Sequence, residues 1–411
     1  MVQPESGAAI VKPKRRRIEP GILAAGAIEA LRGTGYALCF TYLALYLHTQ
    51  RGMPMTRVGV ILLSSGILAG MCQLLGGMFA DRFGHRRTFV IYQTSELFAF
   101  ATVASLMASG APLWSIVLAV VLAPCLGGMA GTSMAAIIAD LSAKDRMAES
   151  YGLLAIAGNI GWAIGPMAGG FLLGIASYGW LFAAGAATAC LSLIGVPFLP
   201  RGREVADARP LSLRNFKPLL ADRRLVIFCG LCLLFFLSMA QWGSTLSVFA
   251  VEWIGLPTEQ YGLLMSISGA LIVAFQFPVS RRIERLRLRR ALVLGCLLYG
   301  LGFLSFGWVN GFVPAIGSIV VLVAGEMLFV PAALALVGKL SSAEHRGKNM
   351  GLFGLSGTLG TSLGPLLGGA MMDAFPGNAP LLWAAVSFSS FVAAAGFLAW
   401  QGYPRTSAVA E

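Results

Sequence analysis

Three ionisable side chains stand inside long apolar runs of this sequence, where a charge is expensive to keep. They are Glu29, Arg32 and Glu326. A charged group near the middle of a bilayer costs about 2.5 kcal/mol or more, so a residue retained there is a candidate for function. A buried carboxyl group can take up and release a proton, and a guanidinium group can hold a carboxylate or another anion. The residues therefore indicate proton transfer and ion pairing.

Glu29 and Arg32 lie three residues apart, which places them about 60° apart on one helix face. Tyr36 and Phe40 continue the same stripe. If the helix enters the bilayer near Gly21, a rise of 1.5 Å per residue puts Arg32 about 16 Å deep, close to the midplane. Two interpretations stay open, a proton-coupling pair and a structural ion pair.

Glu326 lies in the apolar run 324–331, which has no other charged residue. An apolar surrounding favours the neutral form of a carboxyl group, which suits the uptake and release of a proton near neutral pH. When ionised, the same group would attract a cationic ligand. A purely structural role is the alternative.

Other polar residues of the apolar runs are weaker candidates. Thr132, Asn159, Gln241 and Trp242 could line a cavity, or could simply pack between helices. Glu96 lies nearer the end of its run, where its side chain could extend toward water or support the adjacent loop.

The composition excludes several classes of protein. Of 411 residues, 57% are hydrophobic and only 12% are charged, so too little polar surface exists to cover a soluble globule. The net charge of +12 would suit a nucleic-acid binder, but the charges are too few to form such a surface. The seven cysteines lie in apolar runs and imply no disulfide framework. We find no nucleotide-binding loop, Ser/His/Asp arrangement or metal-ligand spacing among the three histidines, and therefore expect neither an enzyme nor a bound cofactor or metal.

The elements that must position these residues are membrane-spanning helices, each needing about 20 mainly apolar residues. The sequence predicts an all-α protein with twelve spans. They cover about 21–47, 57–80, 88–109, 112–140, 150–175, 178–199, 224–251, 260–280, 291–308, 312–340, 349–373 and 380–402. Of 30 Lys and Arg residues, 27 fall in the tails or in alternate loops on one side. Because positive charge stays on the cytoplasmic side, both termini are predicted to be cytoplasmic.

The two halves of the chain repeat each other. A shift of 203 residues pairs Asp81-Arg82 with Glu284-Arg285, and a shift of 199 pairs Gly165-Pro166 with Gly364-Pro365. Each repeat has six spans, and parallel repeats of this kind are typical of transporters. The predicted organisation is a tail (1–20), a six-helix bundle (21–199), a cytoplasmic loop (200–223), a second six-helix bundle (224–402) and a second tail (403–411).

A charged motif connects the second and third predicted spans. Glycine at its start would allow a neighbouring helix to approach, the second glycine allows a tight turn, and the acid can pair with an arginine or with a helix N-terminus. The motif comprises Gly77, Asp81, Arg82, Gly84, Arg86 and Arg87. It resembles the loop signature of the major facilitator superfamily, GxLaDrxGrrxxl. A degenerate second copy occupies residues 280–290, and the motif is expected to act as a conformational gate.

A glycine pattern recurs in the fifth and eleventh spans. Glycines four residues apart form a smooth stripe against which a second helix can pack, and proline bends the helix. The residues are Gly161, Gly165, Pro166, Gly169 and Gly170, with Gly360, Gly364, Pro365, Gly368 and Gly369. The first copy resembles the span-5 signature associated with antiporters of the same superfamily. Its duplication also fits a role in packing and hinge motion.

The resemblance extends over the whole chain and is nearest to the twelve-span drug:proton antiporters and multidrug exporters of bacteria. It implies alternating access, in which two bundles rock around a midplane cavity lined by spans 1, 4, 7 and 10. It further implies a small-molecule substrate, a proton gradient as energy source, a location in the bacterial inner membrane and a working monomer.

One position departs from that family. Many of its antiporters carry an arginine early in span 4, where this chain has Pro124. This chain therefore cannot use an arginine at that place to relay protons. The alternative function is a symporter or facilitator for a defined polar solute such as a sugar. The sequence does not identify the substrate, the direction of transport or the coupling ion.

Overall fold

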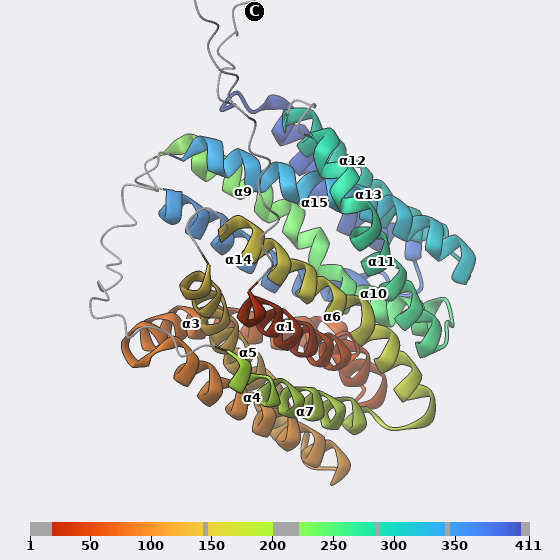
Figure 1. Cartoon of the computed structure of the whole chain (residues 1–411). Coiled ribbons are helices and arrows are strands. Elements are labelled where there is room, and N and C mark those ends of the chain that lie inside the picture. Colours follow the sequence, from red (N-terminus) through yellow and green to blue (C-terminus); the bar gives the residue numbers. More distant parts are fainter. Residues whose placement is uncertain (1–18, 143–146, 200–221, 284–287, 342–345, 404–411) are drawn as a thin grey trace, which may run out of the picture.

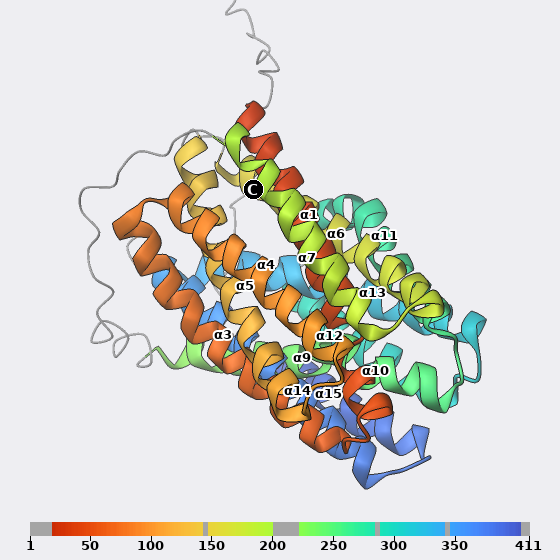
Figure 2. The ribbon, with the colours of Figure 1, turned by 90° about the horizontal axis from the view of Figure 1, so that it is seen from below.

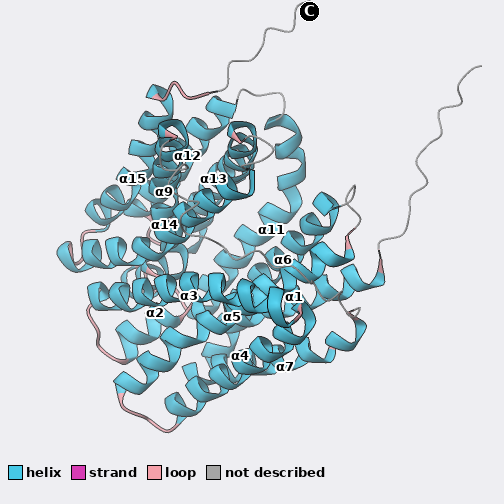
Figure 3. Cartoon of the chain, turned by 90° about the vertical axis from the view of Figure 1, so that its left-hand side faces the viewer, coloured by secondary structure: helices cyan, strands magenta, loops and turns pink. Residues whose placement is uncertain are grey.

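The structure is a computed structural model, and it describes residues 19–142, 147–199, 222–283, 288–341 and 346–403. Throughout these ranges the regular structure is helical, and no strand is present in them (Figure 3). The predicted all-α membrane fold is confirmed.

The N-terminal half contains α1 (Pro20–Phe40), α2 (Leu43–Leu45), η1 (Tyr46–Gln50), α3 (Met55–Phe83), α4 (His85–Ala108), α5 (Leu113–Leu141), α6 (Met147–Ile175), α7 (Tyr178–Ile194) and η2 (Val196–Phe198). The C-terminal half contains α9 (Arg223–Met239), η4 (Ala240–Gly243), α10 (Thr245–Val248), η5 (Phe249–Trp253), α11 (Thr258–Ile283), α12 (Leu288–Ser305), η6 (Phe306–Trp308), α13 (Phe312–Leu340), α14 (Arg346–Ala374) and α15 (Ala379–Ala399).

Ten helical segments of the described residues are long and apolar enough to cross a membrane. The helices α1 and α14 coincide with the first and eleventh predicted spans but are not among those ten. Both are of membrane length, at 21 and 29 residues. They are more polar because α1 carries Glu29 and Arg32 and α14 is rich in glycine, serine and threonine. For these two helices, crossing the membrane stays a prediction.

The first helix of each half is broken in the same way. The helix α1 ends at Phe40 and continues through the short helix α2 into the π-helical turn η1. Its counterpart α9 ends at Met239 and continues through η4 and α10 into the π-helical turn η5. Irregular backbone at these depths is tolerated because it is packed within the protein, away from lipid.

Helix pairs in one half correspond to helix pairs in the other. The helix α1 packs on α6 as α9 packs on α14, and α4 packs on α7 as α12 packs on α15. The halves meet along two long contacts, α3 with α14 and α6 with α11. Figure 1 shows the helices of the C-terminal half above those of the N-terminal half. Figure 2 is seen from below, so the N-terminal half faces the viewer.

The charged loop motif forms a tight turn between α3 and α4. Gly84 has a φ of 88°, a conformation that residues with a side chain rarely adopt, and its backbone N–H still bonds to the Ala80 carbonyl. The expected close approach at Gly77 is not found, since a Cβ there would meet nothing within 4 Å. The close approach occurs one residue earlier, where α5 presses Met129 against Gly76.

The two ends of the helical bundle are named as follows. We call one end the inner end, because it carries the basic residues Arg82, Arg86, Arg87, Arg223, Arg224, Arg281 and Arg282. We call the opposite end, with residues 48–57 and 252–259, the outer end. These names follow the predicted orientation.

Candidate functional site

A cavity of about 580 Å³ lies between the two halves. Spans 1, 4, 7 and 10 all contribute to its wall, as the resemblance implied, and spans 2, 5, 8 and 11 contribute as well. The first four supply Tyr36, Phe40, Thr41, Pro124, Met239, Trp242 and Glu326 among others. The other four supply Leu62, Ser65, Asn159, Trp162, Met265, Ser268, Thr361 and Ser362 among others. The cavity is thus shared by both repeats.

Aromatic rings form the wall contributed by the N-terminal half. Tyr36 and Phe40 stack with their ring centroids 4.3 Å apart, and Trp162 of α6 lies 6.1 Å from the Tyr36 ring. The stacking follows directly from their spacing of four residues on α1. On the other side, Trp242 is held by a 2.6 Å hydrogen bond from its indole N–H to the hydroxyl oxygen of Tyr299. The cavity therefore offers flat aromatic surfaces, and the indole N–H of Trp242 is already bonded to Tyr299.

Glu326 is the one charged residue among the described residues that line this cavity. It projects from α13, near Tyr299 of α12. No described residue forms an ion pair or hydrogen bond with its carboxyl group. A carboxyl group without a fixed partner, facing a cavity, is free to exchange protons and ligands.

The structure places two of the predicted cavity residues elsewhere. Gln241 is fully buried, and its amide donates to the carbonyls of Leu237 and Gly364 while accepting from Thr245. It is therefore used in packing η4 against α14, because a buried amide must be satisfied. Thr132 lines a different cavity. Tyr36, Phe40, Asn159 and Trp242 do line the central cavity.

A second cavity of about 440 Å³ adjoins the first toward the inner end. The two share Tyr36, Ala69, Pro124 and Trp162 as lining residues. Its wall is polar and charged, with Glu29, Arg32, Gln73, Glu96 and Thr132. Apolar and ionic surfaces are thus segregated into neighbouring spaces.

Arg32 is the centre of the charged wall. Its Nη1 lies 2.8 Å from Glu29 Oε2, and its Nε lies 3.8 Å from Glu96 Oε2. Its Nη2 donates to the Gly127 carbonyl at 2.8 Å. One guanidinium group therefore serves two carboxyl groups, one from its own helix and one from α4.

Glu96 is the site residue that the sequence argument undervalued. It is almost fully buried and faces Arg32, with its carboxyl group packed on Gly127. Judging depth alone placed it too near the surface. A better signal lies in span 4, where glycines make room for polar side chains of neighbouring helices. Gly127 faces Glu96, Gly128 faces Gln73 and Gly131 faces Arg32.

This arrangement bears on the missing span-4 arginine. Gly127, which accepts the bond from Arg32, lies one helical turn beyond Pro124 on α5. A guanidinium group thus contacts this stretch of α5, although it comes from α1.

The two glycine motifs pack the broken helices of their own halves. A Cβ at Gly161 would lie 2.6 Å from the backbone N of Thr34, and one at Gly165 would lie 2.6 Å from the Thr34 carbonyl oxygen. Gly169 meets the Tyr42 ring. In α14 the corresponding Gly360, Gly364 and Gly368 face α9, η4 and α10.

The last glycine of each motif faces the opposite half. Gly170 meets Thr258 at the start of α11, and Gly369 meets Met55 at the start of α3. Pro166 and Pro365 both line the central cavity, and the Pro166 carbonyl accepts a 2.6 Å bond from Tyr42. Close packing of helices is therefore the role that the contacts of both copies support.

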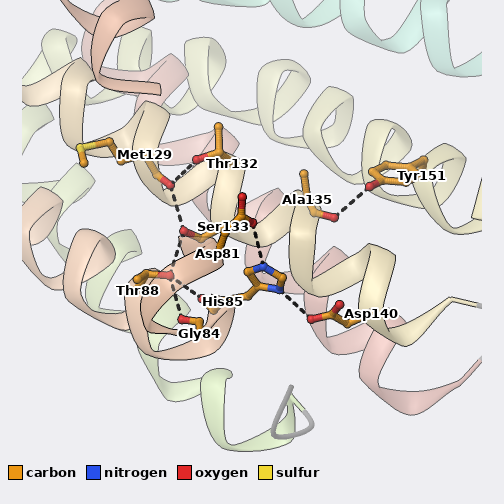
Figure 4. A network of polar contacts seen from close by, with 10 residues as sticks. All are labelled: Asp81, Gly84, His85, Thr88, Met129, Thr132, Ser133, Ala135, Asp140 and Tyr151. Atoms are coloured by element: carbon orange, nitrogen blue, oxygen red, sulfur yellow. Dashed lines mark hydrogen bonds and ion pairs between the residues drawn. The ribbon is translucent and has the colours of Figure 1, made fainter. Parts of the chain in front are cut away.

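The loop motif at the inner end is joined to α5 through a histidine (Figure 4). The Nδ1 of His85 lies 2.7 Å from Asp140 Oδ2, and its Nε2 lies 3.4 Å from Asp81 Oδ1. The sequence allows two partners for Asp81, an arginine or a helix N-terminus; among the described residues the side chain that pairs with it is this imidazole. Arg82 and Arg87 are exposed, and Arg86 is partly buried. Glu284 and Arg285 of the second copy lie outside the described residues.

Hydrogen bonds and ion pairs between described residues of opposite halves lie in the outer half of the bundle. Asp373 of α14 accepts from the backbone N–H groups of Met55 and Thr56 and from the Thr56 hydroxyl. Tyr42 lies 3.4 Å from the Thr258 carbonyl, and the Ser266 hydroxyl donates to the Ala163 carbonyl. In the predicted orientation, with the charged cavity on the inner side, this corresponds to an inward-facing arrangement.

Comparison with known proteins agrees with this architecture. A family model described as Major Facilitator Superfamily matches residues 26–323 and 231–411. Multidrug resistance protein MdtH of Klebsiella pneumoniae is 25% identical over 382 residues, covering 91% of this chain and 92% of that protein. The class C tetracycline resistance protein of Escherichia coli is 26% identical over 322 residues, covering 75% and 78%.

Solved structures of the same fold include the nucleoside transporter NupG, with a TM-score of 0.77 and 18% identity over 93% of this chain and 99% of that one. A D-xylose-proton symporter has a TM-score of 0.76 and 16% identity over 94% and 98%. These identities support the fold alone. From the family match and the helical architecture, the chain belongs to the major facilitator superfamily and is a multi-pass membrane transporter.

Proposed function

We propose that this transporter exports drug-like, amphipathic compounds in exchange for protons. The observation that carries the proposal is a largely apolar cavity between the halves whose described lining contains one carboxyl group, that of Glu326. Aromatic rings and methionine side chains bind varied apolar shapes, because they adapt without needing matched hydrogen bonds. The relatives named for tetracycline and multidrug resistance support the same substrate class.

In the proposed cycle, ionised Glu326 holds the positively charged part of a substrate that enters from the inner side. The halves then rock and open the outer side. A proton from outside binds the Glu326 carboxylate, which removes the attraction and releases the substrate. After the return to the inward-facing state, the proton leaves to the inner side. The proton gradient supplies the energy, and no bound cofactor enters the cycle.

Glu29, Arg32 and Glu96 contribute a second group of protonatable residues beside the cavity. We assign them to holding α1, α4 and α5 together, because Arg32 contacts all three helices. The chain would act as a monomer in the inner membrane of a bacterium.

The test replaces Glu326 by glutamine, which keeps the size and polarity of the side chain but cannot release a proton. In proteoliposomes, Glu326→Gln should lose at least tenfold in transport of a cationic dye driven by an imposed pH gradient. Exchange of an uncharged substrate between equal concentrations should continue, because it needs neither the charge of the carboxylate nor net proton movement. Glu259→Gln, at the outer end and away from the cavity, is the control. Full gradient-driven transport by Glu326→Gln would refute the role of this residue.

A second candidate function is transport of a defined polar solute, as symporter or facilitator. Hydroxyl groups in the cavity wall favour it, since they could bond to a sugar or nucleoside. They come from Thr41, Ser65, Ser244, Ser268, Thr361 and Ser362. The same vesicles should therefore be tested with labelled xylose and uridine. Saturable uptake of either solute, without transport of the dye, would favour this function.

A further inference from the structure

The outer end contains an ion pair that joins the two halves. His48 lies in η1, and Glu252 lies in the corresponding π-helical turn η5 of the other half. His48 Nε2 is 3.1 Å from Glu252 Oε2, and both side chains are about 70% buried, with exposed fractions of 27% and 31%. The pair thus connects the broken ends of the first helix in each repeat.

The hydrogen-bond partners of the imidazole determine how many protons it carries. His48 Nδ1 lies 2.6 Å from the carbonyl oxygen of Met53, which can only accept. The Nδ1 atom must therefore carry a hydrogen. In the neutral ring, Nε2 would then present a lone pair to Glu252, and a lone pair facing a carboxylate at 3.1 Å is repulsive. The observed contact needs one more proton, either on Nε2 or on the carboxyl group.

Other ionisable groups at this end have different partners or positions. Arg51 donates to the Tyr46 hydroxyl at 2.7 Å, and Arg57 is exposed. Glu259 packs against Gly174, and Asp373 caps α3. Tyr178 of α7 lies near Glu252 but is neutral at physiological pH. Among the described residues, His48 is the only basic group that pairs with Glu252.

We propose that His48 and Glu252 form a proton-dependent latch that holds the outer end closed. The contact needs one proton more than the separated groups, so the pH outside the cell would set the occupancy of the latch. Acid conditions outside favour the closed outer end, and alkaline conditions favour its opening. Neither His48 nor Glu252 lines the central cavity that contains Glu326.

The latch can be tested by measuring the distance between spin labels on the two halves. Ser109 and Asn310 are exposed on outer loops of opposite halves and would be changed to cysteine. Cys72 and Cys190 are the more accessible native cysteines and would be replaced by alanine. Distances in lipid nanodiscs would be recorded at pH 5, 6, 7 and 8.

As the pH rises, the ratio of closed to open outer ends should fall by up to about tenfold per pH unit, the limit for loss of one proton. Glu252→Gln keeps the contact without the extra proton, because its amide can donate to Nε2. His48→Arg keeps the contact with Glu252 because arginine carries a permanent positive charge. Both variants should lose the pH response. Asp373→Asn should shift the ratio toward the open form while keeping the response.

Two results would overturn the proposal. One is a label distance in the otherwise native chain that is the same at pH 5 and pH 8. The other is a pH response that persists unchanged in both Glu252→Gln and His48→Arg. The second result would assign the response to a different group, such as His85 at the inner end.

Discussion

Arg32 connects more of the candidate site than any other described side chain. It neutralises Glu29, lies beside Glu96 and donates to the backbone of α5. Its side chain is 91% buried, so these interactions are poorly screened by water. Removing the guanidinium group would leave two carboxyl groups facing each other without a cation.

We therefore expect Arg32→Gln to destabilise the protein by about 3 kcal/mol, the usual cost of breaking a buried ion pair from one side. The double variant Arg32→Gln/Glu96→Gln should recover at least half of this loss, because one of the two unpaired carboxyl groups is gone. Thermal unfolding in detergent measures both effects. Arg57→Gln, at an exposed position, serves as the control and should unfold like the native chain. Equal stability of the single and double variants would contradict the pairing.

The sequence identified most of the charged residues near the site but only one of their two pairings. Spacing along one helix was enough to predict the Glu29–Arg32 contact, which the structure contains. The contact of Arg32 with Glu96 spans two helices, so it depends on packing that no local pattern records. The position of Gln241 could not be predicted for the same reason. Its amide is satisfied by Gly364 of α14, and only the packing of α14 shows this.

At the scale of elements, the contact between α1 and α6 depends on the absence of side chains. A Cβ atom at position 165 would lie only 2.6 Å from the carbonyl oxygen of Thr34. Backbones this close gain packing along their full length, which is the main attraction between helices in a membrane. The stripe therefore positions Tyr36 and Phe40 on the face of α1 that borders the cavity.

Gly165→Ala should consequently force α1 and α6 apart and destabilise the protein by about 1–3 kcal/mol, as expected for overpacking. Gly158→Ala is a matched control in the same helix, because a Cβ there meets nothing within 4 Å. It should be neutral or stabilising by about 0.5–1 kcal/mol through helix propensity. Thermal unfolding of both variants provides the comparison. The packing argument fails if the two variants unfold at the same temperature.

Elements were easier to predict than contacts, because hydrophobic length is a local property. The apolar runs coincide with the described helices to within several residues. The breaks after Phe40 and Met239 were not predicted. Neither break contains proline, but the second contains Gly243-Ser244, a kind of pair at which helices commonly kink.

At the scale of the whole molecule, the two halves are bonded at the outer end, and the central cavity lies between them. The second cavity adjoins the central one toward the inner end and is lined by the N-terminal half. This shape predicts from which side of the membrane water can reach the cavities. A residue on the charged cavity should be reached by water from the cytoplasm but not from outside. Thr132 of α5 is such a residue.

We expect Thr132→Cys to react with a membrane-impermeant maleimide in inside-out vesicles and not in right-side-out vesicles. Ser109→Cys, on an exposed outer loop, should show the opposite pattern. Both variants would carry alanine in place of Cys72 and Cys190. Labelling of Thr132→Cys from the outside alone would show that the inner end is not the open one.

The carboxyl group of Asp373 has one more consequence for this molecule. It occupies two N–H groups at the first turn of α3 that no helical carbonyl can reach. When the halves part at the outer end, these donors lose their protein partner and must bind water instead. Opening is then a hydration reaction as much as a rotation of bundles, so the activity of water becomes a variable that sets the balance between the closed and the open outer end.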